Sequence, residues 1–119
     1  IGEVARFLGL AAEKLAPGGL LLLETINPIC LTALLQAYLL DPTHRTPLHP
    51  QTLRFLAEQA GFFVQEVRFL RPVPSEARLA PWPAEAGAWA EIANANIARL
   101  NNLLFVPQDY ALIATWPGE

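Results

Sequence analysis

The chain has 119 residues, enough for one small domain with one hydrophobic core. Hydrophobic residues make up 53% of it and charged residues 16%, a balance that excludes a disordered chain. The net charge is −3 and the basic residues are scattered, whereas nucleic-acid-binding surfaces are basic and clustered. No apolar run is long enough to span a bilayer and no signal-peptide pattern opens the sequence, so we expect a cytoplasmic location.

The first half of the chain predicts a helix, a strand and a second helix. Apolar residues recur at helical spacing over residues 3–15: Val4, Phe7, Leu8, Ala11 and Leu15. The turn "APGG" ends this helix, and the run "LLLLET" predicts a strand over residues 20–24 that is buried on both faces. A short apolar helix is expected over residues 29–38, before the polar loop "LLDPTHRTPLHP".

The second half predicts two more helices and two more strands. Pro50 can open a helix that closes on Gly61, and a strand follows over residues 63–70. After a proline-rich excursion, residues 86–104 predict a helix with six inward-facing residues: Trp89, Ile92, Ala93, Ile97, Leu100 and Leu104. The last strand covers residues 109–116. This alternation predicts an α/β fold.

The segment "LAPGGLLLLETINP" resembles the second half of a class I S-adenosylmethionine-dependent methyltransferase domain. The pieces "KLAPGGLLLLET", "TLRFLAEQAGFFVQEVRFL" and "DYALIATW" follow in the order that the family has. With the loop "DPTHRTPLHP", the chain is also similar to bacterial methyltransferases associated with O-antigen and other surface glycans. The resemblance implies that residues 1–119 form the C-terminal part of one methyltransferase domain, with a proline-rich and helical insertion at about 71–107.

The resemblance implies the C-terminal half of a Rossmann-like fold in three layers. Its sheet is three-stranded and mixed, with flanking helices, and the last strand lies between the other two, antiparallel to both. The family's glycine-rich turn and ribose-binding acid belong to the first half, and Gly18–Gly19 is only a helix stop. S-adenosylmethionine is therefore the cofactor of the parent protein, and the chain alone is not expected to bind it. The initial Ile1 and the absence of methionine also suggest a fragment.

The loop at residues 39–50 permits three interpretations. A metal site is one, but the spacing of His44 and His49 matches no standard zinc motif, so no metal is expected. A stiff connector capped by Asp41 is the second. The third is an acid–base site, which the resemblance favours because the loop would lie over the acceptor. His44, ahead of His49, is then the general base for methyl transfer to a hydroxyl.

Four further residues are candidates for binding the acceptor: Glu24, Asn27, Asp41 and Arg45. Arg45 suits an anionic acceptor, although a surface salt bridge explains it equally well. Glu24 and Asn27 end the first strand and could instead form the turn before Pro28.

Several residues outside the loop have open roles. Cys30, in an apolar run, is interpreted as a small buried hydrophobe. Trp82 and Trp89 pack in the interior or stack on a sugar ring. Four asparagines on one helix either cap it or face a polar ligand: Asn94, Asn96, Asn101 and Asn102.

Two functions compete. The first is a fragment of an enzyme that methylates a hydroxyl or phosphate of a glycan or small molecule. The second is a non-catalytic, methyltransferase-like module that binds a partner. In either case we expect a homodimer, formed through the exposed edge of the strand at residues 20–24 or by exchange of the first helix.

Overall fold

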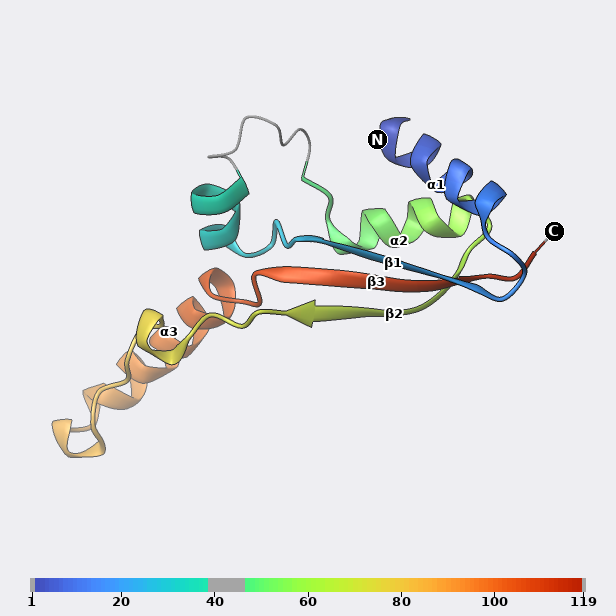
Figure 1. Cartoon of the computed structure of the whole chain (residues 1–119). Helices are drawn as coiled ribbons and strands as arrows, with labels where there is room; N and C mark the ends of the chain where they lie inside the picture. The colour runs from blue at the N-terminus through green and yellow to red at the C-terminus, as the bar shows by residue number, and fades with distance from the viewer. Residues whose placement is uncertain (1, 39–46, 119) are drawn as a thin grey trace.

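Three strands form one antiparallel sheet in the order β1-β3-β2 (Figure 1). They are β1 (Gly19–Ile26), β2 (Phe63–Leu70) and β3 (Asp109–Trp116). The central strand β3 pairs antiparallel with both neighbours, as in Leu22 opposite Ile113 and Val67 opposite Leu112. This confirms the predicted strand order and the direction of the last strand. The computed structural model describes residues 2–38 and 47–118, without the side chains of residues 36–38.

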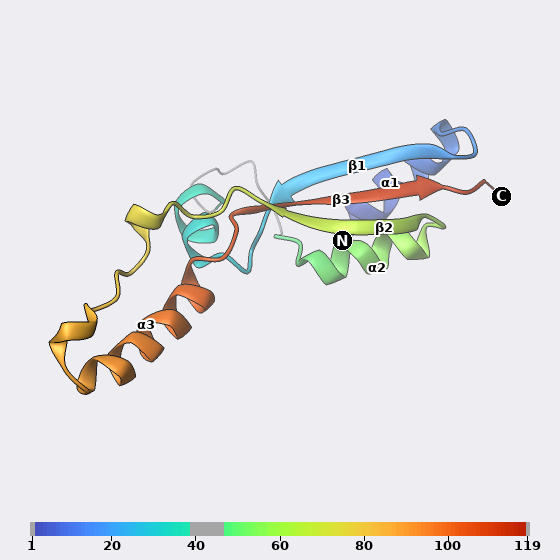
Figure 2. The same cartoon turned by 90° about the horizontal axis from the view of Figure 1, so that it is seen from below.

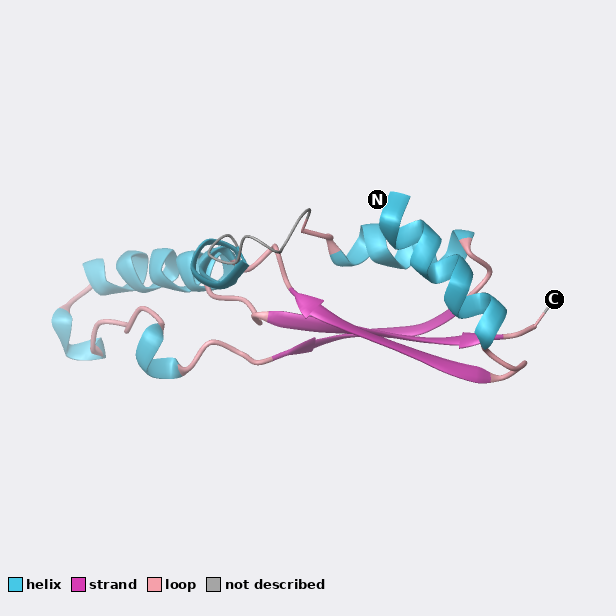
Figure 3. Ribbon diagram, turned by 45° about the horizontal axis from the view of Figure 1, so that its top comes forward, coloured by secondary structure: helices cyan, strands magenta, loops and turns pink. Residues whose placement is uncertain are grey.

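Two helices cover one face of this sheet (Figure 3). They are α1 (Gly2–Lys14) and α2 (Pro50–Gln59). Between them and the sheet lies the main core, whose buried members are Leu8, Leu21, Leu53, Ala57, Phe62, Val64, Tyr110, Leu112 and Ala114. After β1 the chain forms a short π-helical turn, η1 (Ala33–Tyr38). None of the described helices is long and apolar enough to cross a membrane.

Glycines lie in both turns that lead into the outer strands, β1 and β2, which run in the same direction on either side of β3. Gly18 has φ 82°, and a Cβ at Gly19 would stand 2.9 Å from the carbonyl oxygen of Ala16. Gly61 has φ 100°, and a Cβ there would stand 2.9 Å from the ring of Trp116. An L side chain is disfavoured at such positions, so the sequence stops α1 and α2 where the strands must begin.

The opposite face of the sheet carries no helix among the described elements. Leu20 and Leu22 are each 59% exposed and Phe63 is 55% exposed, all on this open face. The predictions of a strand buried on both faces and of three layers are therefore wrong for this chain. The apolar run presents apolar side chains on both faces of the sheet, but α1 and α2 cover only one of these faces.

The molecule is elongated because residues 71–107 leave the sheet as a projecting arm (Figure 2). Its Cα radius of gyration is 18.8 Å, against about 13–14 Å for a compact domain of this length. The arm contains the short helices η2 (Ser75–Ala77) and η3 (Ala84–Ala86) and the longer α3 (Trp89–Leu104).

Helix α3 is mostly exposed, and only Ala90 and Asn101 are buried along it. Trp89 is 52% exposed, Ile92 71% and Leu100 42%, so the prediction that these three face inward is wrong. The reason is the packing partner. The helix lies against an extended segment of its own arm rather than against the sheet, and this narrow contact covers only part of the predicted apolar stripe.

Two asparagines hold α3 to this extended segment. Asn101 Nδ2 donates to the carbonyl oxygen of Leu79 at 3.0 Å, and its Oδ1 accepts from the Leu79 N–H at 2.9 Å. Asn94 forms the same pair of bonds with Trp82, at 3.0 and 2.7 Å. Seven helical residues rise about 10.5 Å and three extended residues span about 9–10 Å, so the two spacings match. We call these four hydrogen bonds the asparagine clamp.

The clamp settles part of what the sequence left open. Asn94 and Asn101 serve the arm's own backbone, and Asn96 accepts a hydrogen bond from Arg99 at 3.2 Å. Trp82 and Trp89 pack edge to face on each other, with ring centroids 5.1 Å apart and both side chains about half exposed. Stacking of this pair on a sugar stays a prediction.

Candidate functional site

The candidate site lies at the rim where β1 and β2 end and β3 begins. In open α/β sheets, ligands bind beyond the carboxyl ends of the strands, which makes this rim the place to look. Of the residues predicted for the site, Glu24, Asn27 and His49 belong to the described part of the chain. Asp41, His44 and Arg45 lie outside the described residues.

Asn27 is buried at the end of β1, and both ends of its amide are engaged. Nδ2 donates to the carbonyl oxygen of Pro107 at 2.8 Å, and Oδ1 accepts from the Ile29 N–H at 3.1 Å. The side chain therefore closes the turn around Pro28 and ties it to the segment that enters β3. These bonds favour the turn-forming alternative that the sequence offered for Asn27.

His49 stands immediately before α2 and caps it. Its exposed side chain accepts a hydrogen bond from the Gln51 N–H at Nδ1, at 3.1 Å, which leaves Nε2 outside this bond. Capping satisfies one of the backbone donors that every helix leaves free in its first turn. The structure gives His49 a structural role and does not test the catalytic one.

Glu24 is exposed on the open face of the sheet, opposite Ala111 of β3. His49 belongs to the helix-covered side, so the structure does not bring these two predicted site residues together on one face. The neighbouring Thr25 lies opposite Tyr110 in the ladder.

Tyr110 is a site residue that sequence reasoning missed. It is fully buried in β3, and its hydroxyl donates to the carbonyl oxygen of Leu48 at 2.6 Å. Burial raises the pKa of this hydroxyl to about 12. The bond fixes the chain just before His49, so Tyr110 positions the returning end of the loop. The signal was a tyrosine in a mostly apolar strand, since a buried hydroxyl needs a partner.

Arg71 and Asp109 close the base of the arm. The guanidinium donates to the carboxylate through Nε at 2.5 Å and a terminal nitrogen at 3.1 Å, while Gln108 N–H donates to the Arg71 carbonyl oxygen at 3.0 Å. The Asp109 carboxylate raises the pKa of Arg71 by hydrogen bonding and by its charge. Arg71 also has φ 53°, a left-handed conformation that is costly for a residue with a Cβ.

Cys30 is fully buried, which confirms its interpretation as a small buried hydrophobe. It packs with Ala33 and Val73, and the partly buried Phe105 and Val106 border this small cluster. The cluster joins the segment after β1 to both ends of the arm, so a second small hydrophobic core lies beside the rim.

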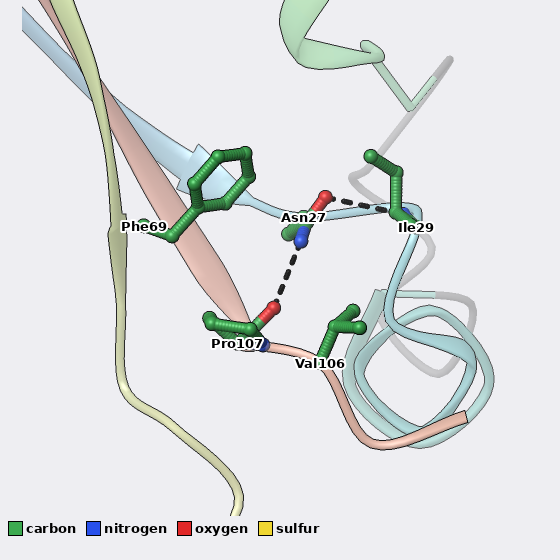
Figure 4. A pocket seen from close by; sticks show the side chains of 5 residues that line it. All are labelled: Asn27, Ile29, Phe69, Val106 and Pro107. Atoms are coloured by element: carbon green, nitrogen blue, oxygen red, sulfur yellow. Dashed lines mark hydrogen bonds between the residues drawn. The ribbon is translucent and has the colours of Figure 1, made fainter. Parts of the chain in front are cut away.

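Two pockets open beside Phe69. The first, of about 260 Å³, is lined by Asn27, Ile29, Phe69, Val106 and Pro107 (Figure 4). The second, of about 220 Å³, is lined by Pro50, Gln51, Arg54, Val67 and Phe69. We call the first one the rim pocket.

The described residues form neither a metal site nor a cofactor cradle at this rim. No three His, Cys, Asp or Glu side chains among them are grouped as metal ligands would be. The described glycines of the sheet region stand near the amino ends of β1 and β2, at Gly18, Gly19 and Gly61, or follow β3 at that same end, at Gly118. A glycine turn that lets the backbone approach a cofactor would be needed at the opposite end. The described residues therefore do not fit a cradle for S-adenosylmethionine.

The chain is similar to a solved SAM dependent methyltransferase from Archaeoglobus fulgidus, with a TM-score of 0.82 and 33% sequence identity. The match covers 96% of this chain and 52% of that chain, so this chain spans about half the length of the protein it matches. No family model and no curated protein matches the sequence. The chain has the α/β fold of one part of a methyltransferase, which supports the resemblance in its general form. The association with surface glycans stays a prediction.

Proposed function

We propose that this chain is the acceptor-side half of an S-adenosylmethionine-dependent methyltransferase that transfers a methyl group to an oxygen of a glycan or small molecule. One observation carries the proposal: the fold and sequence similarity to a SAM dependent methyltransferase runs over nearly the whole chain but over only half of that protein. The other half would supply the glycine-rich turn and the ribose-binding acid.

The two outer strands of the sheet support this division. Strand β2 carries the exposed charges Glu66 and Arg68 and a register shift between Val64 and Glu66, features that blunt an edge against pairing. Strand β1 carries no charge before Glu24, and its Leu20 and Leu22 are exposed. An edge and a face left without protection in this way are suited to be covered by further strands and helices.

The proposed chemistry of this half is activation of the acceptor. The hydroxyl that accepts the methyl group must lose its proton, and a histidine with a pKa near neutrality is suited to take it. We assign this role to His44, with His49 as the second candidate. Arg45 would bind an anionic group of the acceptor, and Glu24 and Asp41 would contribute polar contacts. Asn27 would act indirectly, through the turn that its paired amide closes.

Methyl transfer by the protein expressed from the complete reading frame tests this proposal. We expect His44→Ala to lower turnover by about 100- to 10,000-fold while calorimetry shows unchanged cofactor binding. His49→Asn keeps a capping side chain and removes the imidazole, so it separates capping from catalysis. An equal loss in His49→Asn alone would move the general base to His49. An unchanged rate in both variants would overturn the assignment.

The same protein separates the enzyme from a binding module. The complete protein should bind S-adenosylmethionine saturably, whereas the 119-residue chain should show no such binding at micromolar levels in calorimetry. Micromolar binding by the chain alone would mean that the glycine-rich half is not needed. A complete protein that neither binds the cofactor nor transfers methyl groups would leave the interaction module as the better description.

We also propose that the isolated chain self-associates, because β1 leaves an unprotected edge. Pairing of two β1 edges or exchange of α1 would each give a symmetric dimer. Static light scattering at several concentrations measures the outcome. A constant mass of 13.1 kDa would contradict this expectation.

A further inference from the structure

The rim pocket draws its walls from three separate parts of the chain. Asn27 and Ile29 follow β1, Phe69 belongs to β2, and Val106 and Pro107 lead into β3. Figure 4 shows these side chains grouped around one space, with Phe69 on one side and Ile29 and Val106 on the other. All three segments meet at the rim where an acceptor is expected.

The amide of Asn27 beside this pocket is already paired with backbone groups of two other lining residues. Asn27 is the one polar side chain among its five lining residues, and that side chain is 1% exposed. Its amide nitrogen is bound to the Pro107 carbonyl and its oxygen to the Ile29 N–H. Pro107 has no N–H to offer. The pocket therefore presents carbon surface to a ligand.

This surface discriminates between two kinds of ligand. A sugar placed in the pocket would leave hydroxyl groups without partners, at about 1–3 kcal/mol for each buried group. An apolar group would instead gain about 25 cal/mol for each Å² removed from water. Phe69, 47% exposed, offers an aromatic ring for offset or edge contacts.

The size of the pocket limits the group. An apolar cavity of about 150 Å³ holds one benzene ring. The rim pocket, of about 260 Å³, has room for one ring or two fused rings. It is too small for a whole drug-sized molecule, because the pockets that hold such ligands measure about 300–1,000 Å³.

We propose that the rim pocket binds an aromatic or alicyclic ring of a small-molecule acceptor. That this ligand is a methyl acceptor rests on the function proposed above, whereas the binding of an apolar ring does not. The proposal narrows the acceptor class: any sugar portion lies outside this pocket, and a carbon ring lies inside it.

Titration of the ¹⁵N-labelled 119-residue chain with indole, followed by amide NMR, tests the proposal. We expect saturable shifts at Ile29 and Val106 with a Kd on the order of 1 mM, as suits a small fragment. Methyl α-glucopyranoside should give no saturable shift at these amides. Shifts with the sugar, or indole shifts confined to other regions, would overturn the proposal.

Two variants make the test specific. Val106→Trp fills the pocket and should weaken indole binding at least tenfold, while Leu103→Trp adds the same side chain to an exposed position on α3 and should change Kd less than twofold. Ile29→Trp, at a position 42% exposed, repeats the block from another wall. The Leu112 amide signal reports whether each variant keeps the sheet. Unchanged binding in a folded Val106→Trp or Ile29→Trp variant would contradict the assignment.

The outcome is distinguishable from that of the proposed function. Indole binding without methyl transfer by the complete protein would leave the pocket standing and remove the enzyme. Methyl transfer to a free sugar, without indole binding, would support the enzyme and overturn the proposed ring-binding pocket.

Discussion

The sheet region and the arm of this molecule are held together in different ways. Around the sheet, Leu8, Tyr110 and Leu112 are fully buried within a shared core. In the arm, the buried residues among 71–107 are Val73, Ala90 and Asn101, and several large apolar side chains face outward. The sheet is fixed by burial of many side chains at once, whereas α3 is fixed to its partner segment mainly by the four bonds of the asparagine clamp.

This difference predicts a difference in stability. A buried apolar side chain contributes about 1.5–3 kcal/mol, whereas a hydrogen bond contributes a net of about 0.5–1.5 kcal/mol. Truncating one core residue should therefore destabilise the whole sheet. Removing one asparagine of the clamp should open only the arm. Regions with few buried apolar contacts unfold at lower free energy than the rest of a protein.

Truncation in the core should have the largest effect. Leu112→Ala leaves a cavity at the centre of β3 and should lower the free energy of unfolding by about 2–5 kcal/mol. Leu103→Ala, at a position 67% exposed on α3, should change it by less than about 0.5 kcal/mol. Urea unfolding at one fixed protein concentration measures both. Equal losses in the two variants would show that the arm is part of the same core.

High pH should weaken the sheet region through Tyr110. The folded pKa of about 12 exceeds the ordinary value of about 10 found in the unfolded chain. The unfolded state therefore loses its proton first, so stability is intact below pH 10 and declines between pH 10 and 12. The full loss is about 3 kcal/mol at 1.36 kcal/mol per pH unit.

Tyr110→Phe is the control for this pH dependence. It removes the titrating hydroxyl, so the decline between pH 10 and 12 in urea midpoints should become smaller. An unchanged decline would assign it to another group.

Loss of one asparagine of the clamp should have an intermediate effect on stability, confined to the arm. Asn101→Ala leaves the N–H and carbonyl of Leu79 without these partners, at a cost of about 1–3 kcal/mol. Hydrogen exchange should speed up at the Leu79 amide and stay unchanged at Leu112. Asn102→Ala, at an exposed position on the same helix, is the matched control. Faster exchange at Leu112 would show that the two regions unfold together.

The smallest effect should come from the backbone at the base of the arm. Arg71→Ala and Arg71→Gly both remove the ion pair with Asp109, but only glycine adopts the left-handed conformation at φ 53° without cost. We expect Arg71→Gly to be more stable than Arg71→Ala by about 1 kcal/mol in thermal or urea unfolding. A reversed order would show that this conformation is not retained.

Much of the sheet region could be predicted from sequence because its signals are local. The turns at Gly18–Gly19 and Gly61 mark where helices end, and the resemblance supplied the strand order. The arm could not be predicted in the same way. The partners of Asn94 and Asn101 are backbone groups 12 and 22 residues away, and a backbone group leaves no mark in the residue types. The apolar stripe of α3 indicated burial that its position beyond the sheet does not provide.

At the candidate site, too, the decisive partners are backbone groups distant in sequence. The sequence drew attention to Asn27 as a candidate contact to the acceptor, but not to the Pro107 carbonyl oxygen that its amide binds. The role of Tyr110 depends on Leu48, which is 62 residues distant in sequence. His44 lies outside the described residues, so its role stays a prediction.

The closed base of the arm has a consequence for how such a protein can vary. Leu70 and Asp109 are paired in the ladder, so the chain leaves and re-enters the sheet at neighbouring positions whatever lies between them. Doubling the length of an inserted segment costs only about 0.6 kcal/mol in closure entropy. An arm of different length or composition can therefore be exchanged at this junction without a new register in the sheet. Because Val106 and Pro107 end the arm and also line the rim pocket, such an exchange would change the walls of that pocket while keeping the strand register.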